Sequence, residues 1–528
     1  MPEYLAPGVY TEEIATGPVP IEGVSTSTAG MAGLTDRGPE TVRLITSARE
    51  FTRWFGNPVG PDVSYLSYAV QGFFDNGGRR LFVTRVTRSD AVLSSLVLPG
   101  EGAGLALIAI GPGNLNNRLF ARVIEASRRD AADPTRADST RFRLQLVVYA
   151  AAQQTVDPFA TPDPTRPRPP DPDLVEDFDD LSADPASPDY VLTALQNSCL
   201  VAATVAPGRP ARGGWTAFDG GADGVAPLTL AEFRGAETPP RGIDGLGQID
   251  EISLLCMPDE VNGAIDGGVR DGIRTALVTQ CEELRDRFAV LQVDGRQGDA
   301  SRISPPLTTS YAAIYYPWLR VLDPSGTDTL LVPPGGHITG IYAGTDIARG
   351  VHKAPANVDI RGIVLRDLPG DRKPLEFIVN KRQQDILNPR GINVCRDFRG
   401  DRRGIRVWGA RTLSADAQWK YVNVRRLFIF VEESVDEGVQ WVVFEPNNEA
   451  TWDRVRRSIA NFLTSVWRSG ALMGTRPEEA FFVRCDRTTM SQQEIDTGQL
   501  VCYIGLAAVR PAEFVILRYS HKTSETVA

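Results

Sequence analysis

The sequence predicts a multidomain α/β protein, with an α/β core built from N-terminal, central and C-terminal segments and a β-rich domain inserted between them. Three observations support this fold class. The 528 residues are too many for one hydrophobic core. Apolar segments of strand and helix periodicity alternate in residues 21–90 and again beyond residue 220. Residues 91–220 instead hold short strand-like segments separated by Gly, Asn and Asp.

The N-terminal core segment, residues 21–90, is predicted to form two strands and two helices. The strands are expected near Ser25–Gly33 and at Arg80–Val86, and the helices over Ala48–Phe55 and around Tyr65–Phe74. The sequence Asn-Gly-Gly follows the second helix and is typical of a helix stop.

The insert, residues 91–220, is predicted to be β-rich. Strands are expected at Ala106–Ile110, Phe120–Ala126 and Phe142–Ala150. The segment TPDPTRPRPPDPDLVEDFDD, residues 161–180, is rich in Pro and Asp and poor in apolar residues, so it is predicted to be an exposed loop.

The central domain, residues 221–395, returns to α/β patterning. The apolar run Ile249–Met257 ends at a Pro-Asp pair, as a buried parallel strand does, and Ala289–Val293 is the next expected strand. Between them a helix is predicted over Gly267–Phe288. Its apolar face consists of Val269, Ile273, Ala276, Leu277, Cys281 and Leu284.

The C-terminal core segment, residues 396–510, contains two more predicted helices. Asn423–Gly438 has apolar residues at helical spacing, with Asn423 as N-cap and Gly438 as stop, although a strand over LFIFV is an alternative. Glu449–Ser469 has an apolar stripe of Trp452, Val455, Ile459, Phe462 and Val466. Its opposite face carries Arg454, Arg457, Asn461 and Arg468, which is either a solvated face or an interface.

Composition excludes several classes of function. The net charge of −10 argues against a general nucleic-acid binder, and no apolar stretch is long enough to span a membrane. The N-terminus has no basic and apolar signal sequence, so assembly in the cytoplasm is expected. Of the 56 basic residues 51 are Arg, which fits a GC-rich genome and also ionic interfaces between subunits. The six cysteines are widely spaced, so they are predicted to be reduced and mostly buried.

Motifs for catalysis are missing from the sequence. It has no Gly-Lys pair and therefore no P-loop, and no Ser lies in a G-x-S-x-G elbow. The only histidines are His337, His352 and His521, which leaves little for a metal site. The sequence therefore predicts no enzyme, cofactor or metal, and structural hydrogen bonding for His337 and His352.

Segments along most of the chain resemble contractile tail sheath proteins of phages and related injection machines. They include YLAPGVYTEEI near the N-terminus, then GINVCRDF, VWGARTLSADAQWKYVNVRRLF, FEPNNEATW and RPAEFVILRY, and the match is densest from about residue 310 to 519. The resemblance implies a subtilisin-like but non-catalytic fold for the central domain and an outer position for the insert. It also implies a helical sheath that surrounds an inner tube and contracts to drive the tube through a target envelope. A specialised sheath paralogue, or a hydrolase on the central domain, are the alternatives.

The resemblance further implies extended terminal arms that complete β-sheets of neighbouring subunits. The expected partners are further copies of the chain, the inner tube, and the baseplate and cap proteins, without nucleic acid or membrane insertion. The Arg face of the Glu449–Ser469 helix is expected to point at the tube. The N-terminal arm, residues 1–20, holds the strand Val9, Tyr10, Thr11, Glu12, Glu13 and Ile14. The C-terminal arm, residues 511–528, holds the strand Glu513, Phe514, Val515, Ile516, Leu517, Arg518 and Tyr519.

Overall fold

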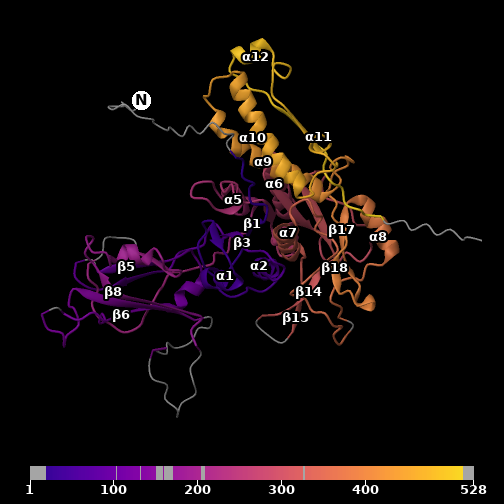
Figure 1. Ribbon diagram of the computed structural model, residues 1–528. Helices are drawn as coiled ribbons and strands as arrows, with labels where there is room; N and C mark the ends of the chain where they lie inside the picture. The colour runs from indigo at the N-terminus through magenta and orange to yellow at the C-terminus, as the bar shows by residue number, and fades with distance from the viewer. Residues whose placement is uncertain are drawn as a thin grey trace, which may run out of the picture. The chain divides into compact units, whose positions relative to one another are not determined.

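The computed structural model describes residues 20–102, 104–130, 132–149, 158–159, 171–203, 208–324, 328–370 and 372–514 (Figure 1). Two compact units are present. The first, Ser25–Arg426, is called the core unit here, and the second, which combines the residues before Ser25 with those after Arg426, is called the C-terminal unit.

A nine-stranded sheet organises the described part of the core unit, in the order β16-β18-β17-β13-β12-β11-β1-β3-β2. The strands from β3 to β17 in this order are parallel, whereas β2 at one edge and β18 near the other run antiparallel to them. The edge strand β16 pairs antiparallel with β18 and so runs in the same direction as the parallel strands. The central strands are buried along their whole length, as expected for parallel strands covered on both faces. Their bounds are β1 Thr28–Gly33, β2 Arg43–Ile45, β3 Arg80–Arg85, β11 Leu254–Cys256, β12 Phe288–Gln292, β13 Ala312–Tyr316, β16 Val358–Asp359, β17 Ile392–Asp397 and β18 Ile405–Val407.

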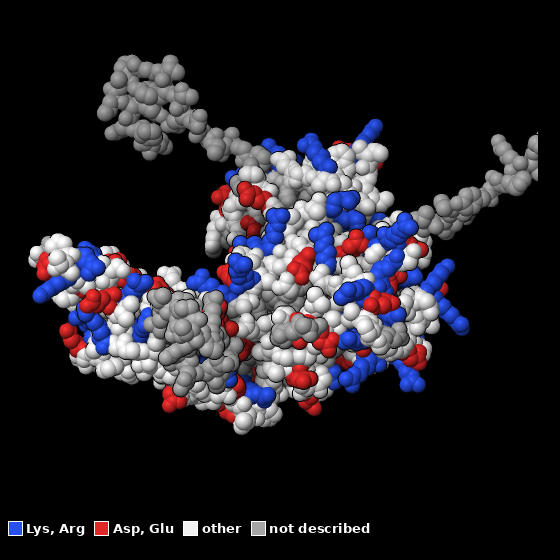
Figure 2. All heavy atoms as spheres, turned by 90° about the horizontal axis from the view of Figure 1, so that it is seen from below, with Lys and Arg blue, Asp and Glu red and all other residues white. Residues whose placement is uncertain are grey.

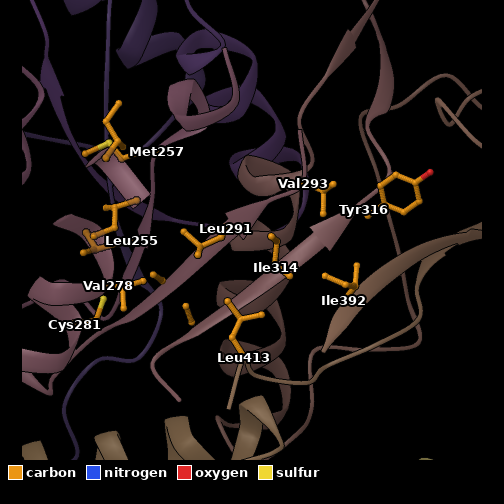
Figure 3. Close-up of a cluster of buried hydrophobic side chains, with 14 of the residues drawn as sticks. Leu255, Met257, Val278, Cys281, Leu291, Val293, Ile314, Tyr316, Ile392 and Leu413 are labelled. Atoms are coloured by element: carbon orange, nitrogen blue, oxygen red, sulfur yellow. The ribbon is translucent and has the colours of Figure 1, made fainter. Parts of the chain in front are cut away.

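Helices cover both faces of this sheet. The short helices α4 (Leu230–Arg234) and α5 (Gly242–Leu246) lie with α6 (Gly267–Leu284) over the hydrophobic cluster that Leu255, Leu291 and Ile314 form on adjacent strands (Figure 3). The other face carries α2 (Leu66–Asp75) and α7 (Gly335–Arg349), with α1 (Ala48–Phe55) beside α2. A separate hairpin is formed by β14 (Leu319–Leu322) and β15 (Thr329–Val332). Helix α8 (Lys381–Leu387) lies beside β17, and its Leu387 joins the cluster that α6 covers.

Helices α2 and α7 are in backbone contact, and glycines make this possible. A Cβ atom at Gly336 would lie 2.3 Å from Cα of Ala69, and one at Gly340 would lie 2.4 Å from the carbonyl oxygen of Phe73. Because no real Cβ approaches other atoms this closely, the glycines at a four-residue interval set the distance between the two helices.

The insert contains two small antiparallel sheets around a core of its own, with β5, β6 and β8 lying together in Figure 1. The sheets have the orders β10-β6-β7-β8 and β4-β5-β9. The expected strands at residues 106–110, 120–126 and 142–150 are confirmed within one or two residues for their described parts. The bounds are β4 Ser95–Leu98, β5 Leu105–Ala109, β6 Leu119–Ile124, β7 Arg141–Val148, β8 Leu174–Ser182, α3 Val191–Leu195, β9 Val201–Ala203 and β10 Thr216–Ala217.

The predicted loop at residues 161–180 is wrong for its described C-terminal part, because Leu174–Ser182 is strand β8 paired with β7. Its carboxylates find partners there. Buried Glu176 accepts hydrogen bonds from Oγ of Ser198 at 2.5 Å and from N of Cys199 at 2.8 Å. Asp177 accepts two from the guanidinium of Arg143, at 2.7 and 2.6 Å. Paired charges allow an acidic segment to join a sheet.

Most expected core helices and strands are confirmed, with three corrections. The run Ile249–Met257 contains a strand only at Leu254–Cys256. Helix α6 ends at Leu284 instead of Phe288, because Arg285 takes a left-handed φ of 63° and the chain enters β12 at Phe288. Leu284 is consequently 44% exposed and does not belong to the buried face.

The C-terminal unit is built on α10 (Glu449–Arg468) and the larger part of α9, a helix that begins in the core unit. The helix alternative for residues 423–438 is confirmed, since α9 spans Val422–Val439. The expected caps are wrong. Asn423 lies inside the helix and its amide donates to the carbonyl oxygen of His352 at 2.8 Å. Gly438 is also internal, and a Cβ there would lie 2.6 Å from the Ile21 side chain, so this glycine serves packing.

The remaining elements of this unit follow α10 in the chain. They are α11 Pro477–Ala480, β19 Phe481–Arg484, α12 Gln492–Asp496 and β20 Tyr503–Leu506. The six cysteines of the chain are free thiols as predicted, five of them buried and Cys502 partly exposed.

Candidate assembly surfaces

Helix α10 is held by a cap and an apolar stripe. The side chain of Asn448 accepts a hydrogen bond from N of Thr451 at 3.1 Å, and this satisfies one of the free donors of the first turn. The helix ends at Arg468, ahead of Gly470, whose φ is 84°. The predicted apolar stripe is confirmed, and Leu463 extends it. Its buried members are Trp452, Val455, Ile459, Phe462, Leu463 and Val466.

The opposite face of α10 presents three of the four predicted residues to solvent. Arg457, Asn461 and Arg468 are exposed, and among the described residues neither arginine forms an ion pair. Arg454 differs, because it donates to a carboxylate oxygen of Glu445 at 2.7 Å and lies over a tryptophan ring. Its charge is therefore partly engaged within the chain.

Arg456 also lies on α10, but it is not among the residues that the sequence predicts for the tube-facing side. Arg456 is exposed, but it donates to Asp453 at 2.6 Å. The i, i+3 spacing of Asp453 and Arg456 is a signal that could have identified this pair. The charge that remains available on the exposed face of α10 is thus concentrated at Arg457 and Arg468.

Strands β19 and β20 form a two-stranded antiparallel sheet beside α10. Within the described residues neither strand has a second partner strand, so the outer edge of each can accept one, although N of Phe481 already donates to the carbonyl oxygen of Pro477. One side of the sheet is half-buried, whereas Phe482 and Tyr503 on the other side are 49% and 57% exposed. Because a two-stranded sheet is marginal alone, these edges and aromatic rings form an incomplete surface.

The predicted arm strands fall largely outside the described residues. This applies to Val9–Ile14 and to Val515–Tyr519. Glu513 and Phe514 are described, lie outside any strand, and Phe514 is 70% exposed. Their predicted role in neighbouring subunits remains a prediction.

The carboxyl ends of β1 and β11 in the core sheet are a second candidate position for a functional site. Connections leave these adjacent strands in opposite directions, and parallel sheets commonly bind ligands at such a point. Here the short 3-10 turn Pro258–Val261 occupies it. Asp259 accepts hydrogen bonds from Oγ of Ser64 at 2.6 Å and from N of Tyr65 at 2.7 Å. Burial raises the pKa of Asp259 to about 6.

Glu260 is the neighbouring buried carboxyl group. It accepts hydrogen bonds from N and Nε2 of Gln292 at 2.7 and 3.1 Å, and Arg274 lies 3.9 Å away. Burial raises the pKa of Glu260 to about 7, although the arginine acts in the opposite direction. The chain's own side chains therefore fill the position that a ligand takes in related sheets.

His337 does not assemble a hydrolytic site with the side chains around it. His337 is 1% exposed, burial lowers its pKa to about 4, and its Nδ1 has no hydrogen-bond partner. The structural hydrogen bond that the sequence predicts for His337 is therefore not made by Nδ1 of its ring. The hydroxyl of Ser67 lines the same 1180 Å³ hollow and is also unpartnered, so no Ser–His–carboxylate chain is formed there.

Metal-binding clusters and membrane-spanning helices are both absent from the described residues. No group of three or more His, Cys, Asp or Glu side chains is placed to hold a metal ion. No described helix has the length and apolarity that a membrane crossing requires. On the face drawn in Figure 2 basic and acidic side chains are interspersed.

Two family descriptions match adjacent parts of the chain and together cover more than half of it. "Phage tail sheath protein central domain" matches residues 243–413, and "Phage tail sheath C-terminal domain" matches residues 414–521. The chain belongs to the phage tail sheath family. The two matched regions meet at residue 413, between β18 and α9 of this sheath protein.

Relatives by sequence are themselves described as tail sheath proteins. The sheath protein is 26% identical over 259 residues to a putative prophage major tail sheath protein of Pseudomonas aeruginosa (strain UCBPP-PA14), covering 46% of this chain and 60% of that protein. It is 25% identical over 214 residues to the tail sheath protein of enterobacteria phage T4, covering 40% and 30%. The alignments thus span less than two thirds of these relatives.

Solved structures match almost the whole chain. The helical sheath of the anti-feeding prophage in its contracted state has a TM-score of 0.59 at 25% identity, with 98% of this chain and 100% of that chain covered. A sheath tail protein of Listeria innocua has a TM-score of 0.56 at 11% identity, over 92% and 96% of the two chains, and therefore shows the fold alone. The mixed α/β fold with several sheets is that of sheath proteins.

Proposed function

We propose that this protein is the subunit of a contractile sheath that polymerises helically around an inner tube and contracts to drive the tube through a target envelope. The observation that carries the proposal is the incomplete sheet of β19 and β20, which exposes two unpaired edges and two aromatic rings in the C-terminal unit. Chains that expose such edges are completed by strands from other chains.

The strands that complete this sheet are the two terminal arms of neighbouring copies, about Gly8–Ile14 and Ala512–Ser520. Each arm makes about five backbone hydrogen bonds at roughly 1 kcal/mol net, which gives about 5 kcal/mol before side-chain burial. The donor surface and the acceptor surface differ, so the contact is heterologous, and with a rotation that does not close it generates a helical filament. Neighbours therefore stay linked while other contacts rearrange.

Contraction is a change between two packings of nearly rigid subunits, with the arms as hinges. The central domain contributes a subtilisin-like framework without hydrolytic function, and the insert lies on the outside of the sheath. The inner tube, a baseplate and a cap are the other components of the particle, which is assembled in the cytoplasm as a phage tail-like structure. The solved relative in the contracted state is a helical sheath, which supports this assignment.

The exposed face of α10 is the proposed contact with the tube. Arg457, Asn461 and Arg468 lie along it, and the two arginines supply positive charge without an internal ion pair among the described residues. A tube surface rich in carboxylates would pair with them through charge-assisted hydrogen bonds. Arg454 is a secondary contributor, because Glu445 already engages it.

The first test is negative-stain electron microscopy of the purified, overexpressed full chain. Hollow, ridged cylinders are expected, because the arms allow polymerisation without the tube. A strictly monodisperse monomer, even at high protein concentration, would contradict the proposal.

A further inference from the structure

Two cysteines of the C-terminal unit lie opposite each other at the end of its small sheet. The ladder pairs Arg484 of β19 with Tyr503 of β20. The next step of the same register places Cys485 opposite Cys502, one residue beyond the last paired positions. The sheet therefore brings together two thiols that are separated in the sequence by the 16 residues 486–501.

The hydrogen-bond pattern shows which kind of pair this is. N of Ala507 donates to the carbonyl oxygen of Ala480 at 2.8 Å, and bonded and non-bonded pairs alternate from there along the ladder. Extended by one residue, this alternation makes Cys485 and Cys502 a non-hydrogen-bonded pair. The Cα atoms of such pairs are about 4.5 Å apart, which lies within the roughly 4.4–6.8 Å that a disulfide spans.

The two thiols have different environments. Cys485 is 2% exposed and packs with Trp452 and Met490, whereas Cys502 at the border of the same cluster is partly exposed. The two thiols shift each other's pKa: the neighbouring Cys485 lowers the pKa of Cys502, and the neighbouring Cys502 together with burial raises the pKa of Cys485. Cys502 is therefore the more accessible and the more readily ionised thiol.

We propose that Cys485 and Cys502 form an intramolecular disulfide when the protein meets an oxidising environment, and that this bond fastens the loop of residues 486–501 to the sheet. The proposal does not depend on the contractile function. In a reducing compartment the thiols stay free, as they are in this structure.

A small disulfide such as oxidised glutathione supplies the oxidising equivalents. The Cys502 thiolate attacks one sulfur of that disulfide, its S–S bond breaks, and one small thiol leaves after taking up a proton. The Cys485 thiolate then attacks Sγ of Cys502 in the mixed disulfide, and the second small thiol leaves with a proton. The protein loses two electrons and two protons, and the small disulfide is reduced to two thiols.

The bond would close the connection between β19 and β20 at its base. Residues 486–501 contain the short helix α12 and the exposed Arg487, which is a tryptic site. Closing a loop of this length restricts its local unfolding, so tryptic cleavage at Arg487 is expected to slow by up to about a hundredfold. The oxidised protein also keeps the fragments on either side of Arg487 linked until it is reduced.

The test is oxidation of the purified full chain with glutathione disulfide, followed by peptide mapping without reduction and by timed trypsin digestion. A single cross-link between the peptides of Cys485 and Cys502 is expected, together with slower cleavage at Arg487. In Cys485→Ser, Cys502 should retain one glutathione because nothing resolves the mixed disulfide. In Cys502→Ser no adduct is expected on native protein. Cys395→Ser, which alters a fully buried thiol of β17, is the matched control and should behave as the wild type.

A measurement on the unmodified chain covers the case in which a variant fails to fold. Under native conditions an alkylating reagent should label Cys502 before the other five cysteines. The proposal is overturned if wild-type Cys502 keeps its glutathione without cross-linking, if the cross-link joins a different pair, or if the protein stays fully reduced.

Discussion

At the scale of single residues, Arg457 and Arg468 differ from the arginines around them. Arg454 and Arg456 are both held by acidic neighbours at 2.7 and 2.6 Å. Surface ion pairs contribute little stability, but they reduce the charge that a partner encounters. The tube-binding role proposed for α10 therefore rests on Arg457 and Arg468 more than on Arg454.

Replacing both by glutamate, Arg457→Glu with Arg468→Glu, is expected to abolish sheath formation on the tube while the subunit stays folded. The two side chains are exposed, so the unfolding midpoint should change by little. Co-expression with the tube followed by electron microscopy measures the effect. Arg136→Glu with Arg302→Glu makes the same charge change on side chains that are 81% and 82% exposed elsewhere, and it should assemble normally. Normal tube-bound sheaths from the α10 variant would refute the tube contact.

Glu260 makes the stability of the core unit dependent on pH. Its folded-state pKa of about 7 lies above its ordinary value of 4.5, so its favourable contribution is complete below about pH 4.5 and is lost as the pH rises through 7. The difference corresponds to about 3 kcal/mol. Glu260→Gln cannot ionise and should therefore gain stability relative to the wild type between pH 5 and pH 8.

Denaturant unfolding of both proteins at several pH values checks this expectation. Exposed Glu101→Gln is the control and should follow the wild type. A constant difference between wild type and Glu260→Gln across this pH range would show that Glu260 is not protonated in the folded protein.

At the scale of elements, the contact between α2 and α7 depends on atoms that glycine lacks. Gly340→Ala would place its Cβ 2.4 Å from the carbonyl oxygen of Phe73, so the helices must separate. A loss of about 1–3 kcal/mol in unfolding free energy is expected. Gly267→Ala in the first turn of α6 meets no atom closer than 3.7 Å and should be neutral or stabilising. Thermal unfolding compares the two, and equal midpoints would contradict the backbone contact.

Strand addition at the outer edge of β19 can be tested with a substitution that leaves the hydrogen bonds between β19 and β20 intact. Given the alternation of bonded pairs, N–H groups of Phe481 and Val483 point away from β20. Val483→Pro removes one outward donor and should prevent polymerisation, whereas Val483→Thr keeps the donor and should polymerise. Sedimentation of the two variants measures the outcome. Polymers from Val483→Pro would exclude strand addition at this edge of β19.

At the scale of the whole molecule, the proposal requires that the arms act between copies. Deleting residues 1–14 is expected to leave a folded monomer that no longer forms cylinders, since the proposed N-terminal strand pairs with a neighbouring copy and not with its own chain. A chain in which the same residues are replaced by an equally long Gly/Ser segment should fail in the same way, which separates sequence from length. Size-exclusion chromatography and electron microscopy decide the question. Cylinders from either variant would show that the N-terminal arm is dispensable.

The sequence by itself determined the α/β class, the family resemblance, and most elements with a clear period, such as the buried stripe of α10. Apolar periodicity is a local property, so it can be read without knowing what an element packs against. The strand in the acidic segment was missed because its stability comes from Arg143 and from the backbone at Cys199, which are distant in the sequence.

Only the tertiary structure decided the features that depend on such distant partners. Gly438 was interpreted as a helix stop, yet it is an internal glycine that accommodates Ile21. Arg454 appeared equivalent to Arg457 until Glu445 was placed beside it. The pairing of Cys485 with Cys502 follows from the register of two strands, which no local pattern encodes. Periodicity fixes what an element is, and long-range packing fixes which of its side chains remain available to a partner.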